Sequence, residues 1–130
     1  MAILLGRPYA PEKASGVDFT DKWIRTELYF GMSRKAGAEI SEAEFEEFID
    51  EIVTPRFPSG LTALDARGQW REDDSKVAKE RSKVLVLIYP RSERRSANAK
   101  IEEIRTEYKK RFSQQSVLRL DMTKGVKAAF

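Results

Sequence analysis

The residues with the clearest potential for chemistry occupy alternate positions in a short stretch, residues 23–30. Arg25, Glu27 and Tyr29 alternate there with residues 24, 26, 28 and 30, which are apolar apart from a threonine, so an extended strand would bring all three side chains to one face. Arginine side chains bind anionic or carboxylated small molecules through paired hydrogen bonds. Glu27 is the only plausible general base, because partial burial on such a face would raise its pKa towards the range that suits proton transfer.

The composition excludes several common kinds of catalytic chemistry. The chain of 130 residues contains no cysteine and no histidine, which excludes thiolate nucleophiles, serine–histidine triads and zinc sites built on these residues. The sequence also lacks a calcium-loop spacing and a glycine-rich phosphate-binding loop. We therefore expect no metal and no cofactor. Whether the protein is an enzyme stays open, since any catalysis would rest on Asp, Glu, Lys, Arg, Tyr or Ser.

Charge and hydropathy restrict the partners and the location. The net charge of +3 is far below the concentrated basic surface typical of a dedicated DNA-binding domain. No run of apolar residues is long enough to span a membrane, and the apolar residues 3–5 are too few for the core of a signal peptide. We therefore expect a soluble, cytoplasmic protein.

Hydrophobic periodicity predicts four strands and two helices, in the order strand, helix, strand, strand, helix, strand. Ser41 and Glu44 have the spacing of a capping box at the start of the first helix, and Pro55 ends that helix. The apolar run at residues 83–89 is typical of a central strand buried on both faces, and the charged residues 72–81 before it are interpreted as a hairpin connection. The predicted strands are residues 23–30, 61–71, 83–89 and 116–121, and the second helix spans about residues 96–112.

This order predicts a ferredoxin-like α+β fold, a βαββαβ sandwich in which two helices cover one face of a four-stranded antiparallel sheet. We assign residues 23–122 to this domain, residues 1–22 to an N-terminal arm and residues 123–130 to a C-terminal tail. The apolar residues 3–5 of the arm either pair as an extra strand or fray.

The sheet face opposite the helices is where we expect a functional site. Alternation within the second and fourth strands extends the face of Glu27 to residues Asp65, Arg67, Gln69, Val117, Arg119 and Asp121. The third strand contributes either residues 84, 86 and 88 or residues 85, 87 and 89. The predicted ligand-binding residues are Arg25, Tyr29, Asp65, Arg67, Gln69, Trp70 and Arg119.

We favour an interpretation in which two copies of the chain pack these faces together as a homodimer and enclose a pocket for a small anionic ligand. Arg25, Arg67 and Arg119 would anchor the ligand. Tyr29 and Trp70 would form aromatic walls around the ligand. The carboxylate of Glu27 would be available for proton transfer.

Two other interpretations remain. In one, Glu27 and Asp65 neutralise the arginines in a structural network of cross-strand ion pairs, and the protein is an assembly or partner-binding module without a small-molecule site. In the other, the face binds single-stranded RNA. The third strand lacks the glycine–aromatic motif of RNA-binding sheets, and acidic residues stand between the arginines, so nucleic acid is the least favoured partner.

The two predicted helices carry opposite charge. Residues 39–51 contain seven acidic residues and no basic one, whereas the region of the second helix is rich in arginine and lysine. Such polarity either steers contacts with another copy or a partner, or is neutralised where the helices meet on the sheet. Assembly of the first kind would weaken at high salt, while apolar packing of sheets would not.

Four phrases in the sequence are distinctive: RTELYFG at residues 25–31, TPRFPSGLT at residues 54–62, LDARGQW at residues 64–70 and SKVLVLI at residues 82–88. Together they resemble a bacterial family known only as a domain of unknown function, over about residues 23–120. The resemblance implies no assigned activity. Members of that family often look exported, with a signal or lipoprotein segment before the domain, whereas this chain has a short arm and no lipobox cysteine.

Overall fold

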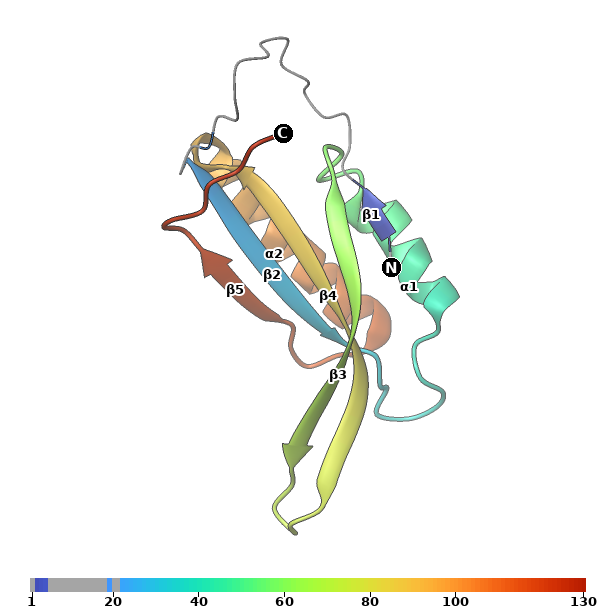
Figure 1. The fold of residues 1–130 in the computed structure, drawn as a ribbon. Helices are drawn as coiled ribbons and strands as arrows, with labels where there is room; N and C mark the ends of the chain where they lie inside the picture. Colours follow the sequence, from blue (N-terminus) through green and yellow to red (C-terminus); the bar gives the residue numbers. More distant parts are fainter. Residues whose placement is uncertain (1, 5–18, 20–21) are drawn as a thin grey trace.

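The computed structural model describes residues 2–4, 19 and 22–130. In this part of the chain five strands form one antiparallel sheet, and two helices cover one of its faces (Figure 1). The strands are β1 (Ala2–Leu4), β2 (Trp23–Gly31), β3 (Leu61–Arg71), β4 (Val77–Pro90) and β5 (Leu118–Met122). The helices are α1 (Glu42–Phe48), which continues into a π-helical turn η1 (Ile49–Val53), and α2 (Arg94–Phe112), which follows a 3-10 turn η2 (Arg91–Glu93).

The sheet has the strand order β1-β3-β4-β2-β5. Strands β3, β4, β2 and β5, with the two helices on one side, form the ferredoxin-like arrangement, so the predicted α+β fold is confirmed. Strand β1 pairs with β3, with Leu4 opposite Leu61, and residues 2–4 therefore form an extra edge strand. Apart from residues 19 and 22, the rest of the predicted arm lies outside the described residues, and the proposed domain boundaries stay predictions.

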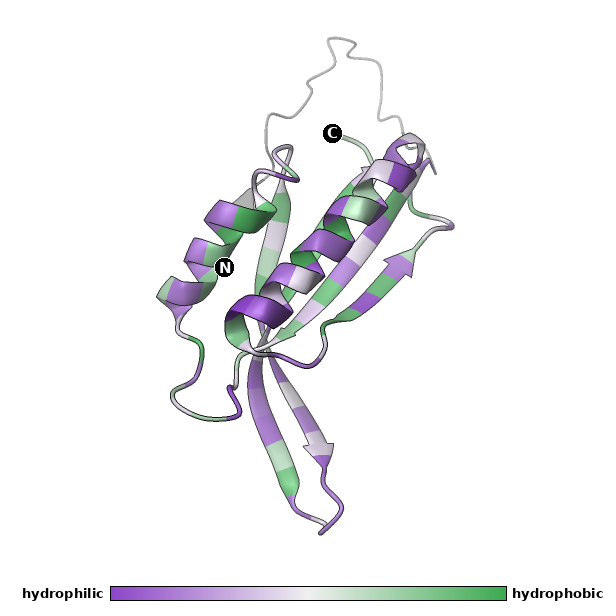
Figure 2. Cartoon of the chain, turned by 180° about the vertical axis from the view of Figure 1, so that it is seen from behind, coloured by the Kyte–Doolittle hydropathy of each residue, from purple (hydrophilic) through white to green (hydrophobic). Residues whose placement is uncertain are grey.

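The hydrophobic core lies between the helices and the covered face of the sheet. Phe30 of β2 packs into an aromatic cluster, with ring centroids 4.5 Å from Tyr108 and 5.8 Å from Phe45. The Tyr108 hydroxyl donates to the Gly31 carbonyl at 2.6 Å, which satisfies its polar atom inside the core. Burial of each such ring contributes about 1.5–3 kcal/mol to folding. Hydrophilic residues lie mainly on the outer sides of both helices (Figure 2).

The capping and inner faces of the helices follow the prediction from sequence. The Ser41 hydroxyl accepts from the Glu44 amide at 3.1 Å, and the Glu44 carboxylate accepts from the Ser41 amide at 3.1 Å, which completes the capping box. Arg34 also donates to Glu44, and this hydrogen bond, followed by the one from the Ser41 backbone, lowers the pKa of Glu44 to about 2. The apolar stripes that helical spacing predicts are buried, except for the half-buried Ile52, and their buried residues are Phe45, Phe48, Ile49 and Val53, then Ala97, Ile101, Ile104, Tyr108 and Phe112.

The connection between β3 and β4 is shorter than predicted. β4 begins at Val77, so the loop spans only residues 72–76, with Ser75 in the left-handed region at φ 71°. The two strands form a ribbon that extends past the helices and twists until the strands cross in Figure 1. Neither side of the outer ribbon is buried, so charged residues occupy both sides and the alternation of a half-buried strand disappears. The prediction of a loop over residues 72–81 is therefore wrong.

Oppositely charged residues of the two helical segments meet at their seam. Arg111 of α2 pairs with Glu51 of η1 at 2.9 Å, and Arg56, just after η1, pairs with Glu103 of α2 at 2.9 Å. All four side chains remain accessible to water, so each pair contributes little to stability. Part of the opposite charge of the two helices is thus neutralised within the chain. This agrees with the expectation that the helices neutralise each other where they meet on the sheet.

Candidate functional site

Strand pairing decides which residues of β4 share the open face with those of β2. Val84 lies opposite Tyr29, and Val86 lies opposite Glu27. Residues 84, 86 and 88 therefore belong to the open face. Residues 85, 87 and 89 belong to the covered face, where Leu85 and Leu87 are fully buried.

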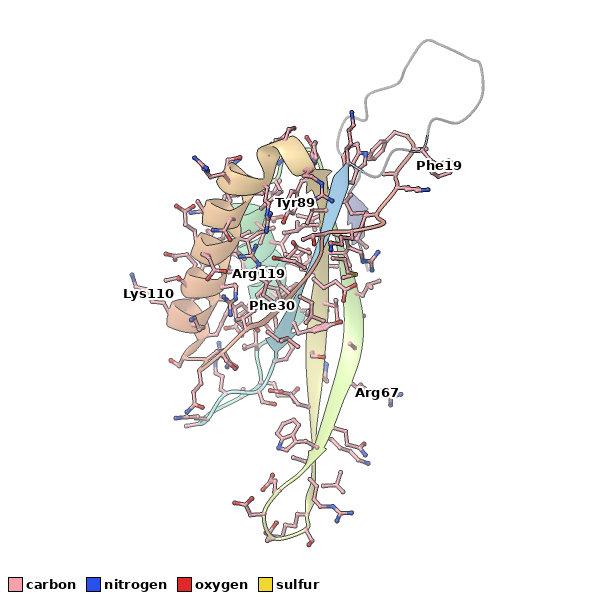
Figure 3. The ribbon with its side chains drawn as sticks, turned by 90° about the vertical axis from the view of Figure 1, so that its left-hand side faces the viewer. Phe19, Phe30, Arg67, Tyr89, Lys110 and Arg119 are labelled. Carbon is pink, nitrogen blue, oxygen red and sulfur yellow. The ribbon has the colours of Figure 1, made fainter. Side chains whose placement is uncertain are left out.

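The predicted face of β5 is wrong. Leu118 lies opposite Tyr29, on the open face. Arg119 points to the other side, where its guanidinium donates to Asn98 at 2.9 Å and to Glu102 at 2.8 Å, both on α2. Figure 3 shows Arg119 between α2 and the sheet. The covered face of β5 therefore comprises Arg119 and Asp121, preceded by the buried Val117, and the open face comprises Leu118, Leu120 and Met122.

The predicted face of β3 is also wrong for Asp65. Asp65 lies opposite Lys83 and forms an ion pair with it. The Lys83 side chain is nearly buried on the covered side, where its ammonium lies 5.5 Å from the centroid of the Phe45 ring and 2.7 Å from Glu42. Arg67 and Gln69 follow Asp65 at alternate positions of β3. They therefore belong to the same side of the strand as Asp65.

Alternation failed here for a physical reason. It divides the residues of a strand into two sets, but it does not say which set faces the core. The prediction places the charged set of the edge strands on the open face, as if that face were exposed to water. In this chain the charged residues of β5 and of the inner part of β3 are instead bound to residues around the covered face, such as Glu102 and Lys83.

Arg67 lies far from the polar residues of β2. It pairs with position 81 of β4, whereas Arg25 pairs with position 88, so the two arginines are roughly 20 Å apart along the strand. Because the ribbon twists beyond the sheet, Arg67 projects away from the helices (Figure 3). Gln69 and Trp70 are exposed further along the same strand.

The open face is mostly apolar. Large side chains are exposed on it, with Trp70 50%, Ile88 45%, Leu118 54% and Leu120 42% exposed. Ile88 of β4 and the two leucines of β5 flank the polar residues of β2. Isolated apolar residues on a surface are ordinary, but several large ones exposed on one sheet face mark an interaction surface. Because the predicted open face of the last strand holds Val117, Arg119 and Asp121, it leaves Leu118 and Leu120 towards the helices, and their exposure on the open face corrects that prediction.

Three polar side chains of β2 form a closed cluster on this face. Arg25 Nε donates to Glu27 Oε2 at 2.9 Å, and the Tyr29 hydroxyl donates to Glu27 Oε1 at 2.7 Å. The hydrogen bond from Tyr29, followed by that from Arg25, lowers the pKa of Glu27 below its ordinary value. The expectation of a raised pKa is therefore wrong for the single chain, and a carboxylate with both oxygens bound is a poor general base.

A groove of about 970 Å³ opens at the end of the open face, where the ribbon leaves the sheet. Tyr29, Arg67 and Trp70 of the predicted site line it, and the loop after β2 adds Arg34 and Lys35. The turn between α2 and β5 closes another side. The tertiary structure thus brings three of the predicted residues to one groove, whereas Arg25, Asp65, Gln69 and Arg119 lie elsewhere.

Glu80 of β4 lines the groove and was not identified from sequence. Its carboxylate accepts from the Ser33 amide at 3.1 Å and lies over Gly31, where a Cβ atom would come within 2.7 Å of it. Gly31 therefore allows the carboxylate to approach the backbone of β2. The available signal was a glycine at the end of an alternating strand, and it does not name the residue that approaches.

The part of the chain that the structure describes contains neither a cluster of metal ligands nor a helix suited to a membrane. Within it, no group of three or more acidic side chains gathers as metal ligands do. Across the same residues, no helix combines the length and the apolar character that crossing a membrane requires.

Comparison with known proteins supports the fold and the family. A family model described as "Protein of unknown function (DUF3574)" matches residues 25–130, which confirms the resemblance to a family without assigned activity. A phage SAM lyase in complex with S-methyl-5'-thioadenosine has a similar structure, with a TM-score of 0.60 and 16% identity over 93% of this chain and 94% of that chain. CutA from Synechococcus elongatus PCC7942, complexed with Bis-Tris, has a TM-score of 0.53 and 9% identity over 87% and 89% of the two chains. At these identities the likeness shows the fold alone. Curated protein sequences contain no significant match.

Proposed function

Because the chain belongs to this family of unknown function, we propose its function from its own geometry: a homo-oligomer, in the simplest case a dimer, that binds a small anionic ligand. The subunits pack through the open sheet face, and the ligand occupies the groove at the end of that face. The observation that carries this proposal is an exposed apolar sheet face that ends in a groove lined by basic residues.

The apolar side chains of the open face support packing against a second copy. Ile88, Leu118 and Leu120 are between 42% and 54% exposed in the single chain. Removing such surface from water stabilises an interface by about 25 cal/mol per Å² of apolar area, before the costs of association. Sheets pack face to face at about 10 Å, and a two-fold axis would bring the same residues together from both copies.

The polar cluster on β2 is suited to burial in such an interface. Both carboxylate oxygens of Glu27 accept hydrogen bonds from Arg25 and Tyr29, and the charge of Arg25 is balanced by that of Glu27. A hydrogen-bonded ion pair loses less on desolvation than an isolated charge does. The cluster would then form a polar part of the interface. The remaining N–H groups of Arg25 could donate to a ligand or to the second copy.

The groove supports the binding of an anion that carries a planar group. Lys35, Arg67 and Lys79 line it with positive charge, opposed by the carboxylate of Glu80. Arg67 can donate two parallel hydrogen bonds to a carboxylate or a phosphate. The indole of Trp70 is half exposed and can stack on a planar ligand.

Adenosine 5'-monophosphate is the first probe, because it joins an anion to a planar base. S-methyl-5'-thioadenosine, the compound named with the similar phage lyase, has a related nucleoside without the phosphate and serves as the uncharged comparison. We expect the monophosphate to quench tryptophan fluorescence saturably, and the uncharged compound to bind about tenfold more weakly. A monophosphate that binds no better than the uncharged compound contradicts an anionic ligand.

Arg67→Ala separates binding from folding. Arg67 is exposed on the ribbon, so its removal should weaken binding of the monophosphate about tenfold and leave the melting temperature nearly unchanged. Arg71→Ala is the matched control, since Arg71 is an exposed arginine on the same strand that does not line the groove. A large loss of stability with unaltered binding would assign Arg67 a structural role instead.

Leu118→Asp tests the oligomer. A carboxylate at the centre of an apolar contact should shift the mass seen by light scattering from oligomer to monomer. Thr106→Asp introduces the same charge at an exposed position of α2 and should leave the mass unchanged. High salt should also leave the wild-type oligomer intact, because apolar contacts are not screened. A wild-type chain that is monomeric at micromolar concentration would refute the packing of open faces.

An assembly or partner-binding module without a small-molecule site is the second candidate. The observation in its favour is that Glu27, Asp65 and Arg119 already form ion pairs within the chain. This candidate expects the open faces to assemble while adenosine 5'-monophosphate fails to bind, so the two experiments above distinguish it from the first.

A further inference from the structure

A second cavity lies at the opposite end of β2 from the groove. It has a volume of about 760 Å³ and opens between the start of α2 and the outer edge of β5. The side chains of Arg91, Arg94, Arg95 and Arg119 line it, together with the carboxylate of Asp121. Guanidinium groups gathered in one cavity repel one another unless an anion lies between them.

Arg119 is held firmly in the wall of this cavity. Its Nη1 atom donates to Asn98 at 2.9 Å and to Glu102 at 2.8 Å, and its Nε atom donates to Asp121 at 3.1 Å. The side chain is only 15% exposed. Its Nη2 atom makes no hydrogen bond with any residue that the structure describes. A guanidinium oriented in this way can offer its remaining N–H groups to a ligand with little further loss of entropy.

The carboxylate of Asp121 is already bound within the chain. The Thr26 hydroxyl donates to Asp121 Oδ1 at 2.7 Å, and the Tyr89 hydroxyl lies 2.8 Å from the Thr26 hydroxyl oxygen. Burial by itself would raise the pKa of Asp121, but the hydrogen bonds from Thr26 and Arg119 outweigh it and the pKa is lowered. Asp121 therefore stays ionised and balances one positive charge, which leaves an excess of positive charge in the cavity.

Arg94 and Arg95 occupy the first turn of α2. Both are exposed, and neither forms an ion pair with another residue in the described ranges. This turn contains no acidic residue, and the amide groups at a helix start add partial positive charge. Arg91 lies beside them and donates to the Thr123 carbonyl, so it ties the chain after β5 to the cavity.

We propose that this cavity binds a phosphate group, either as inorganic phosphate or as a small phosphate monoester. Guanidinium groups match phosphate oxygens with pairs of N–H donors. A bound dianion would also offset the repulsion among the arginines. The cavity shares no lining residue with the groove. Binding of phosphate in the cavity is therefore independent of the ligand proposed for the groove.

The test is a titration of the 130-residue chain, followed by two-dimensional ¹H–¹⁵N NMR at constant ionic strength. The probes are inorganic phosphate and glycerol 3-phosphate, with sodium chloride as the control. We expect saturable shifts in the amide signals of residues 94–98 and 123 with both phosphates and none with chloride. Equal affinities would identify the phosphate group alone as the ligand, and tighter binding of the ester would identify a phosphorylated metabolite.

The variant for this test is the double substitution Arg94→Gln with Arg95→Gln, because both side chains are exposed and their removal leaves the network around Arg119 intact. It should weaken phosphate binding by about tenfold or more. Lys109→Gln with Lys110→Gln is the matched control, since it removes the same charge from the far end of α2. Lys110 points outwards there (Figure 3).

The site is refuted if wild-type protein shows no saturable shift with either phosphate. It is also refuted if the control variant loses as much affinity as the arginine variant, because the effect is then one of overall charge. The unperturbed NMR spectrum of each free variant verifies that the fold is retained. Arg67→Ala should leave phosphate binding in this cavity unchanged, which separates it from the groove.

Discussion

The two faces of the sheet satisfy their side chains in opposite ways. On the covered face, aromatic residues are buried and the charged residues at its margins are bound within the chain, as Lys83 is by Asp65 and Glu42. On the open face, large apolar residues such as Leu118 remain exposed, and a polar cluster around Glu27 is satisfied within itself.

This difference indicates which face of the sheet finds all its packing partners within a single chain. The covered face has its hydrophobic and electrostatic partners in α1 and α2, so its packing energy is available to the monomer. The apolar surface of the open face gains free energy only when something else covers it. Substitutions on the covered face should therefore affect folding, and substitutions on the open face should affect assembly.

The largest expected effect comes from Phe48→Ala on α1. Phe48 is fully buried and its ring lies 5.2 Å from that of Tyr108, so its truncation should lower the free energy of unfolding by about 3–5 kcal/mol. Leu118→Ala on the open face should lower the free energy of unfolding of the monomer by less than about 1 kcal/mol. Urea unfolding at low protein concentration measures both. Equal losses would mean that the open face is part of the monomer's core.

An intermediate effect is expected from Thr26→Val, which keeps the shape of a buried side chain and removes its hydroxyl. That hydroxyl joins Tyr89 to Asp121, so its loss should cost about 1–3 kcal/mol of unfolding free energy. Thr26→Ser retains the hydroxyl and should recover most of this loss. If valine proves as stable as threonine, the polar network at this edge of the covered face does not contribute to stability.

The smallest effect is expected from Tyr29→Phe on the open face. Removing the phenol leaves Arg25 as the hydrogen-bond donor to Glu27, so the pKa of Glu27 should rise towards its ordinary value of 4.5. A carboxyl group whose pKa is lowered by folding stabilises the folded state at any pH above its pKa in the unfolded chain. This stabilisation is lost as the pH falls through its pKa in the folded chain. The variant should therefore lose slightly less stability than wild type on acidification below pH 4.5. NMR titration of the Glu27 carboxyl measures the shift, and an unchanged pKa would contradict the cluster.

Much of the architecture could be predicted from local pattern. The capping box of Ser41 and Glu44 and the buried stripe of α2 follow from spacing along a helix. The apolar run that follows Lys83 correctly indicates a central strand, but the expected burial on both faces is wrong, since Ile88 is exposed on the open face. The extension of this strand back to Val77 was missed, since the outer ribbon has no buried side and so no periodic signal.

The candidate site was predicted less well. Tyr29, Arg67 and Trp70 do line one groove, but Arg119 lies across the sheet and Asp65 is bound to Lys83. Glu80 could not be found, because its role depends on its position over Gly31 in a neighbouring strand. The cavity of arginines was not expected either, since it combines the start of α2 with the end of β5.

The sequence by itself determined the order of the elements, the start of the first helix and the division of each strand into two sets of residues. These features depend on periodicity and on hydrogen bonds between near neighbours. Only the tertiary structure decided which set of β3 and β5 faces the helices and where the ribbon carries Arg67. That choice depends on the energy of packing whole strands against distant partners, and on the twist that accumulates along them.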